Sequence, residues 1–335
     1  MTQLPIPQHF QPDRVGEIWR VPYQQRSIEA RAWAQTHQLR PTAAGNSKVR
    51  LLLIDVQNTF CLPDFELFVG GRSGRGAIED NVRLCEFIYG NLGEIDQIIA
   101  TMDTHHLHQI FHPIFWIDEH GETPTPAVTT ISPADVKSGK WRVNPAFGTE
   151  QPEHLQAYAL HYVEQLSDGG KYPLLIWPYH AMLGGIGHAL VPAIEEAIFF
   201  HGIARTSQAS FSIKGDRTLT ENYSALAPEV FTNQSGETIA SKNDSLIELL
   251  LDSDKLIIAG QAQSHCVAWT VNDLLTEIQT IDPQLARKVY LLADCTSPVV
   301  IPGVVDYTAQ AEAAYQRFAD AGMNIIKSTV DRDFW

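Results

Sequence analysis

Three reactive side chains stand where short apolar runs end. Asp55 closes the run VRLLLID, Asp103 closes QIIATMD, and Cys266 follows KLIIAG by a short turn. Carboxylates act as general bases and metal ligands, and a cysteine thiol acts as a nucleophile. Each residue also has a structural explanation, because a strand-end aspartate often caps a turn and an isolated cysteine is more often a packing residue. Convergence of the three in space would favour chemistry.

Cys266 lies at the predicted start of a helix. The letters GQAQSHC indicate a tight turn, and VAWTVNDLLTEI has helical periodicity. Backbone N–H groups and the positive end of the helix dipole stabilise a thiolate at such a position, so we expect a lowered pKa for Cys266. Asp55 is a candidate base, and Lys214 in SFSIKGDRTLTENYSAL is a candidate source of positive charge. Taken alone, Lys214 is typical of a solvated surface lysine.

A second group of polar residues lies in MDTHHLHQIFH. Asp103 and His105, two positions apart, are typical of the start of a metal site with carboxylate and imidazole ligands, although a histidine-rich loop is often simply solvated. His180, in LLIWPYHAMLGG, follows a rigid apolar segment in which an unpaired imidazole is costly to bury. His180 is therefore a further candidate for this site.

Alternating strand and helix patterns predict the framework that positions these residues. Parallel β-α-β units and a doubly wound, mainly parallel six-stranded sheet with helices on both faces are expected, which is an α/β fold. Ligands of such sheets bind outside the carboxyl ends of the strands, where Asp55, Asp103 and Cys266 are placed. The strands are predicted at residues 49–55, 98–103, 197–202, 255–261, 289–294 and 324–330.

Two segments do not follow this alternation. Residues 1–47 are predicted to be an N-terminal extension that packs on the main domain, 48–335, and they contain an amphipathic stretch at 25–39. Residues from about 112 to 171 are polar, contain prolines and hold a single predicted helix from 152, ended by Gly169 and Gly170. We interpret them as an insertion.

The bulk composition excludes some classes of function. A formal net charge of −15 argues against nucleic-acid binding, which needs clustered lysine and arginine. The sequence has no membrane-spanning apolar run and no leader pattern at its start, so we expect a cytoplasmic protein with no membrane partner. The widely spaced cysteines fit a reducing compartment, and Cys61, Cys85 and Cys295 are expected to be packing residues.

The chain resembles the isochorismatase-like cysteine hydrolases, and most closely the nicotinamidases among them. The resemblance covers roughly residues 48–110 and 174–330, and it leaves out the extension and most of the insertion. It rests on five motifs in the order of the family: LLLIDVQNTF, TMDTHH, WPYHAMLGGIG, FSIKGDRTLTENYSAL and AGQAQSHCVAWTV.

The resemblance implies a role for each matching position. Asp55, Lys214 and Cys266 would form the catalytic triad. Asp103, His105 and His180 would hold a divalent metal, with zinc expected first and iron or manganese as alternatives. Phe60 and Trp177 would flank a flat substrate ring. The oxyanion would be held by the backbone N–H groups of Ala262 and Cys266, after a cis peptide at Gln261–Ala262.

The implied activity is hydrolysis of a small amide such as nicotinamide through a thioester, by a protein that self-associates as a homo-oligomer. Three features depart from the family pattern: the long insertion, the turn sequence QAQSH, and Gln109 at a position usually held by a histidine. His108 and His112 are the possible substitutes for that histidine.

Three other functions stay open at this point. The insertion could select the substrate of a different amidase or carbamoyl hydrolase. The chain could be a binding module on a former hydrolase scaffold, or a metal-dependent hydrolase in which Cys266 only packs.

Overall fold

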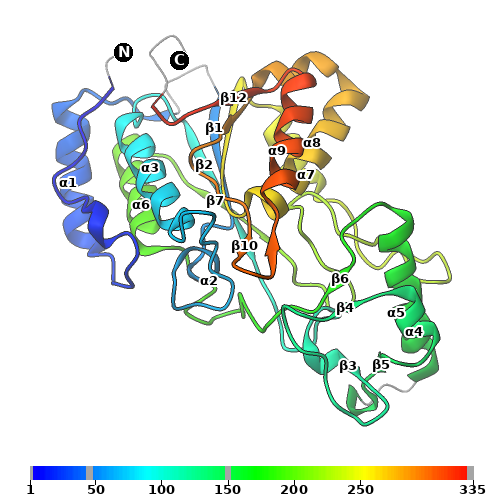
Figure 1. Cartoon of the computed structure of the whole chain (residues 1–335). Helices are drawn as coiled ribbons and strands as arrows, with labels where there is room; N and C mark the ends of the chain where they lie inside the picture. Colours follow the sequence, from blue (N-terminus) through cyan, green and yellow to red (C-terminus); the bar gives the residue numbers. More distant parts are fainter. Residues whose placement is uncertain (1–2, 43–47, 148–151, 330–335) are drawn as a thin grey trace.

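The fold is centred on a six-stranded sheet. The computed structural model describes residues 3–42, 48–147 and 152–329 (Figure 1). The strand order is β12-β9-β8-β1-β2-β7, and every neighbouring pair is parallel. The predicted parallel α/β sheet is therefore confirmed. Its strands are β1 (Val49–Ile54), β2 (Gln97–Asp103), β7 (Ser210–Lys214), β8 (Lys255–Gly260), β9 (Val289–Leu292) and β12 (Asn324–Ile326).

Alternate residues of the central strands enter two different hydrophobic cores. Leu51 and Leu53 of β1 pack into the core that α3 and α6 cover, whereas Leu52 and Ile54 pack into the core of α7, α8 and α9. Figure 1 shows these two helical layers on opposite sides of the sheet. The helices of the layers are α3 (Gly76–Gly90), α6 (Pro192–Arg205), α7 (Asp244–Leu251), α8 (Ala268–Ile281) and α9 (Thr308–Asp320).

One of the six predicted strands is wrong. Residues 197–202 belong to helix α6, which begins with Pro192 at its first position. The run resembles a strand because α6 carries apolar side chains on more than one side. It does so because two different elements pack on α6. The sheet lies under one side of α6, and α1 (Tyr23–Thr36) lies on the other, where Tyr23 packs on Phe199 with ring centroids 5.0 Å apart.

The sixth strand of the sheet is β7, at its edge. This strand was not predicted from the sequence because its apolar residues face outward: Phe211 and Ile213 are more than half exposed. The other five predicted strands form, although the last predicted residue, 330, lies outside the described residues.

The helices predicted around 25–39 and 152–170 form as α1 and α5 (Pro152–Asp168). Gly322 follows α9 with a φ of +98°, a backbone conformation that favours glycine just after a helix. None of the helices in the described ranges is long and apolar enough to cross a membrane. All four cysteines are free and buried, which confirms burial of Cys61, Cys85 and Cys295.

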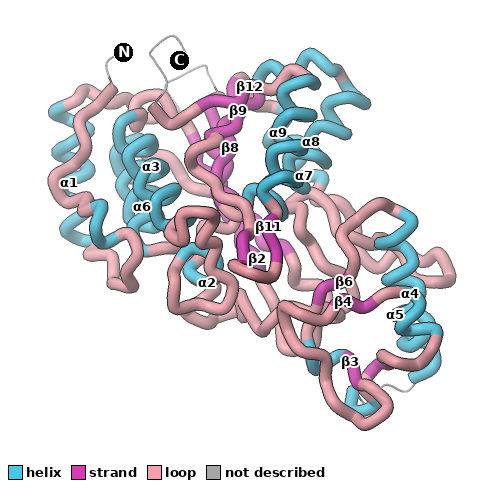
Figure 2. Tube along the Cα trace, in the orientation of Figure 1, coloured by secondary structure: helices cyan, strands magenta, loops and turns pink. Residues whose placement is uncertain are grey.

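The described residues of this predicted insertion, 112–147 and 152–171, are called the 112–171 segment below and lie beside the main sheet (Figures 1 and 2). In this segment, short elements joined by loops precede the long helix α5. Its apolar side chains form a third core that also contains Trp177 and Tyr223, so the segment packs against parts of the chain near the predicted site. The short elements are β3 (Trp116–Ile117), β4 (Thr130–Ile131), α4 (Pro133–Lys137) and β5 (Arg142–Val143), with β6 (Leu174–Leu175) pairing β4 from outside the segment.

Candidate active site and metal centre

Lys214 joins the carboxylate and the thiol that the sequence analysis singled out. Its Nζ lies 3.0 Å from Asp55 Oδ2 and 3.6 Å from Cys266 Sγ. The three residues come from the end of β1, the end of β7 and the turn after β8, at the carboxyl edge of the sheet. All three are buried, so their charges interact with little screening by water.

Asp55 is oriented by a threonine from the neighbouring strand. Thr101 Oγ1 donates to Asp55 Oδ1 at 2.6 Å and accepts from the Asp55 N–H at 3.1 Å. Asp55 itself has a φ of +48°. Oδ2 is thereby left to face Lys214. Thr101 was not predicted from the sequence, where its only signal is a hydroxyl within the apolar run QIIATMD.

Asp55, Lys214 and Cys266 are called the trio below. Their protonation differs from the expectation for Cys266. Burial raises the pKa of the Cys266 thiol well above its ordinary value, although Lys214 acts in the opposite direction. Burial also raises the pKa of Asp55, against the effect of Lys214. Burial alone would lower the pKa of Lys214, but Asp103 and Asp55 hold it well above its usual range. The lowered thiol pKa predicted from the helix start is therefore wrong for the resting site, which pairs a charged lysine with a protonated thiol.

The turn around Cys266 has an unusual backbone. Cys266 lies in a π-helical turn, Gln263–Val267, that leads into α8, and so precedes the regular helix. The carbonyl oxygen of Ala262 accepts from the N–H groups of His265 and Val267 at 3.0 and 3.1 Å, on either side of Cys266. The Gln261–Ala262 peptide is cis, as the resemblance implies.

Gly260 allows β8 to end against β1. A Cβ at Gly260 would lie 2.0 Å from the carbonyl oxygen of Ile54, and its φ is +118°. Only glycine fits such a close backbone approach. The end of β8 therefore brings the Cys266 turn directly beside Asp55.

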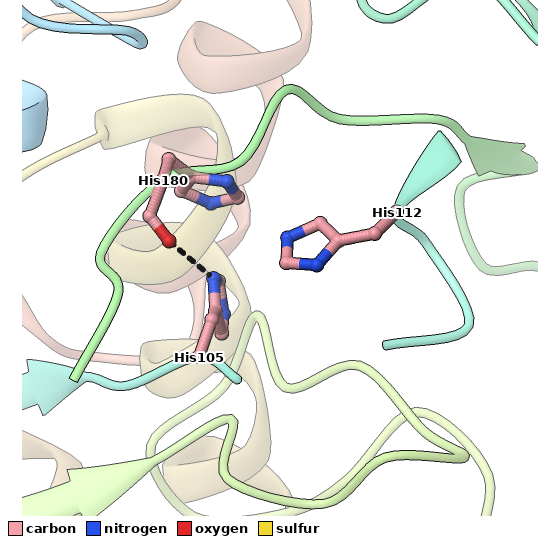
Figure 3. A group of neighbouring side chains, drawn as sticks. All are labelled: His105, His112 and His180. Atoms are coloured by element: carbon pink, nitrogen blue, oxygen red, sulfur yellow. Dashed lines mark hydrogen bonds between the residues drawn. The ribbon is translucent and has the colours of Figure 1, made fainter. Parts of the chain in front are cut away.

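Three buried histidines face one another beside this trio (Figure 3). His105, His112 and His180 each offer one ligand atom, and these atoms all lie within 4.8 Å of one another. Each Nδ1 is held by a backbone carbonyl: His105 by that of His180 at 3.1 Å, His180 by that of Pro178 at 2.7 Å, and His112 by that of Leu107 at 3.1 Å.

That arrangement fits a metal ion. A carbonyl on Nδ1 fixes the tautomer and leaves Nε2 as the ligand atom, as is usual for metal-binding histidines. Among the described residues, His112 Nε2 is buried without a hydrogen-bond partner. Burial lowers the pKa of His112 to about 4, which keeps its imidazole neutral near pH 7. His108 does not join the group, because it is exposed and packs on Phe147 with ring centroids 4.5 Å apart.

Asp103 borders the three histidines. Its Oδ1 lies 3.2 Å from His105 Nε2, and its Oδ2 lies 3.9 Å from His180 Nε2. The Gln57 side chain holds the Asp103 backbone through two hydrogen bonds of 2.8 Å. A Cβ on Gly215, whose φ is +78°, would approach Asp103 Oδ1 to 2.6 Å. Neither Gln57 nor Gly215 was predicted from the sequence to belong to the site.

Asp103 also connects the histidines to the trio. Lys214 Nζ lies 2.9 Å from Asp103 Oδ1 and donates in addition to the carbonyl oxygen of Asn222 at 2.9 Å. Burial alone would raise the pKa of Asp103, but His105 and Lys214 outweigh it and hold this pKa well below its usual range. Asp103 is therefore a carboxylate at neutral pH, which is the form that binds metals.

The two predicted ring-flanking residues both lie near His180. The ring centroids of Phe60 and Trp177 are 5.7 and 6.4 Å from that of His180. Trp177 Nε1 donates to Glu221 Oε1 at 2.9 Å and to the Tyr223 hydroxyl at 3.2 Å. Glu221 is buried, and no pattern in the sequence had distinguished it.

Solved nicotinamidase structures resemble the chain. A nicotinamidase and pyrazinamidase from Acinetobacter baumanii is 18% identical, with a TM-score of 0.50 and coverage of 86% of this chain and 99% of that one. The yeast nicotinamidase is 18% identical, also with a TM-score of 0.50, over 83% and 99% of the two chains. At these identities the likeness establishes a nicotinamidase-like fold. No protein-family model and no curated protein sequence matches the chain.

Proposed function

We propose that this chain is a cysteine hydrolase that cleaves a small primary amide, nicotinamide being the first candidate, to an acid and ammonia. The observation that carries the proposal is the position of Lys214 Nζ, 3.0 Å from Asp55 and 3.6 Å from Cys266 Sγ in a buried site. A nucleophile, a base and a fixed cation in contact are the minimum equipment for covalent amide hydrolysis. The nicotinamidase-like fold supports the same proposed function.

The resting protonation suits this reaction. Asp55 accepts the proton of the Cys266 thiol, and its raised pKa makes the carboxylate a better base than an exposed aspartate. The sulfur attacks the amide carbonyl, and the backbone N–H groups of Ala262 and Cys266 hold the oxyanion. Asp55 then returns this proton to the amide nitrogen, so that the C–N bond breaks and ammonia leaves. Water cleaves the thioester, which releases the acid and restores the thiol.

The proposed metal site consists of Asp103, His105 and His180, with His112 in the place of the missing family histidine. A bound zinc, iron or manganese ion would supply a Lewis acid that orients a lone pair of the substrate. Phe60 and Trp177 would place a flat ring beside His180. We infer a small-molecule partner in the cytoplasm and retain homo-oligomerisation as an expectation.

Ammonia release from a panel of primary amides, nicotinamide first, tests the proposal. Wild-type protein should release ammonia from at least one of them. Cys266→Ala should release none while keeping the fold and the bound metal, because it removes only the nucleophile. Cys295→Ala, a change at a buried cysteine outside the site, is the matched control and should remain active.

Two outcomes would change the proposed mechanism or the proposed substrate. Turnover by Cys266→Ala would exclude the covalent mechanism. Turnover of another amide but not of nicotinamide would select the second candidate, an amidase or carbamoyl hydrolase with a different substrate. The 112–171 segment favours keeping that candidate, since its apolar side chains share a core with Trp177, the proposed ring-flanking residue.

A further inference from the structure

The 112–171 segment contacts the Leu219–Tyr223 loop, which in turn contacts Lys214. Helix α5 of this segment carries Tyr158 and Tyr162, four positions apart and therefore on one face of the helix. The Tyr158 hydroxyl donates to the carbonyl oxygen of Leu219 at 2.6 Å. The Glu221 N–H donates to the Tyr162 hydroxyl oxygen at 3.3 Å. Both tyrosines are buried in the third core, so their hydroxyls are held in place.

Two contacts lead from the Leu219–Tyr223 loop into the site. The carbonyl oxygen of Asn222 accepts from Lys214 Nζ at 2.9 Å. The side chain of Glu221 accepts from Trp177 Nε1 at 2.9 Å. Glu221, which Tyr162 holds, therefore contacts Trp177 directly. Its neighbour Asn222 contacts Lys214.

Three further contacts lie where the chain leaves the segment. Lys171 Nζ is 3.2 Å from Glu229 Oε2 and lies over the ring of Trp269, 4.3 Å from its centroid. The Tyr172 hydroxyl donates to the carbonyl oxygen of Ser264 at 3.0 Å, within the turn that carries Cys266. The same part of the chain thus reaches the turn that carries Cys266. It also reaches Glu229, whose N–H donates to the carbonyl oxygen of Glu221 in the Leu219–Tyr223 loop at 2.8 Å.

We propose that the 112–171 segment supports the active site, with Tyr158 and Tyr162 as positioning residues that fix the Leu219–Tyr223 loop against Lys214 and Trp177. The effect on catalysis rests on the proposed hydrolase function. A loosened loop would let the Asn222 carbonyl leave Lys214, whose charge would then be less well placed beside Cys266. It would also release Trp177 and weaken substrate binding.

Removal of single hydroxyl groups tests this role without creating cavities. The variants are Tyr158→Phe, Tyr162→Phe and the double variant. Tyr89→Phe is the matched control, because Tyr89 is also buried and its hydroxyl contacts His9 of the N-terminal region at 3.1 Å. The readouts are amide hydrogen exchange of residues 218–223, followed by mass spectrometry, and kcat and KM for the best amide, well below the melting temperature.

The double variant should exchange amide hydrogens of residues 218–223 several-fold faster, and its kcat/KM should fall at least about fivefold. Tyr89→Phe should change neither value. Wild-type exchange at 218–223 in the double variant would overturn the proposal, and so would faster exchange with unchanged kcat/KM. If wild-type protein cleaves no amide, the hydrolase function fails separately, and the exchange difference between the double variant and Tyr89→Phe decides the positioning role.

Discussion

At the scale of single residues, Lys214 is the cation that the two halves of the site share. Its Nζ lies within 3.0 Å of Asp55 Oδ2 and Asp103 Oδ1, and these carboxylates keep a buried ammonium charged. Burying a lone lysine would instead favour its neutral form. The charge beside Cys266 therefore depends on both carboxylates, which ties the trio to the histidine group.

His112 is expected to be a metal ligand, unlike its neighbour His108. His112→Ala should weaken zinc binding by about 100-fold, because it removes a neutral imidazole directed at the other two histidines. His108→Ala should leave zinc affinity at the wild-type value, because this exposed side chain packs on Phe147. Competition with a coloured zinc chelator measures both constants. Equal affinities of His112→Ala and wild type would remove His112 from the site.

The candidate reactive residues were easier to predict from the sequence than the residues that hold them. Asp55 and Cys266 could be predicted because a strand end is visible as the point where an apolar run stops. Thr101 and Asn222 could not, because their contacts depend on which strands become neighbours and on where a backbone carbonyl points. The raised pKa of Cys266 was missed for a related reason, since burial is a property of the packed site.

At the scale of elements, the end of β7 requires a glycine. Gly215→Ala should displace Asp103 or His105 and weaken metal binding at least tenfold, because its Cβ would approach their side chains to 2.6 and 3.0 Å. Gly236→Ala is the control, since Gly236 has a similar φ of +80° and its Cβ would have no atom within 4 Å. Metal content after dialysis compares the two. Equal metal loss would show that backbone strain, not contact with the ligands, is responsible.

The elements that the sequence predicted correctly are those with one apolar face or two buried faces. Residues 51–54 of β1 and 256–259 of β8 are all apolar because helices cover both sides of these strands. Helix α6 was misassigned because α1 covers its outer side, which removed the polar stripe of an ordinary surface helix. Strand β7 was missed because its exposed side is the apolar one.

At the scale of the whole molecule, buried histidines make stability sensitive to acid. His201 of α6 is buried, and its Nε2 contacts the carbonyl oxygen of Ile95 at 2.8 Å. Burial lowers its pKa from 6.5 to about 4. The unfolded chain binds a proton at His201 more readily than the folded chain does. The contribution of neutral His201 to the free energy of unfolding is therefore fully present above pH 6.5 and is lost as the pH falls toward 4.

Replacement of His201 should reduce this sensitivity. Between pH 7 and pH 5, wild-type protein should lose about 2 kcal/mol more unfolding free energy than His201→Gln. Urea denaturation at the two pH values measures the difference, with His120→Gln as the exposed control. A difference near zero would show that His201 takes up its proton in the folded state as easily as in the unfolded chain.

The central claim is that Cys266 forms a thioester with the acyl group of its substrate. The most direct test is to mix the protein with an amide that it cleaves, quench with acid during turnover, and measure the intact mass and the modified peptide. The account predicts an added acyl mass on the peptide containing Cys266, absent from Cys266→Ala. Unmodified Cys266 during continuing ammonia release, in an assay that detects a synthetic thioester standard, would contradict it.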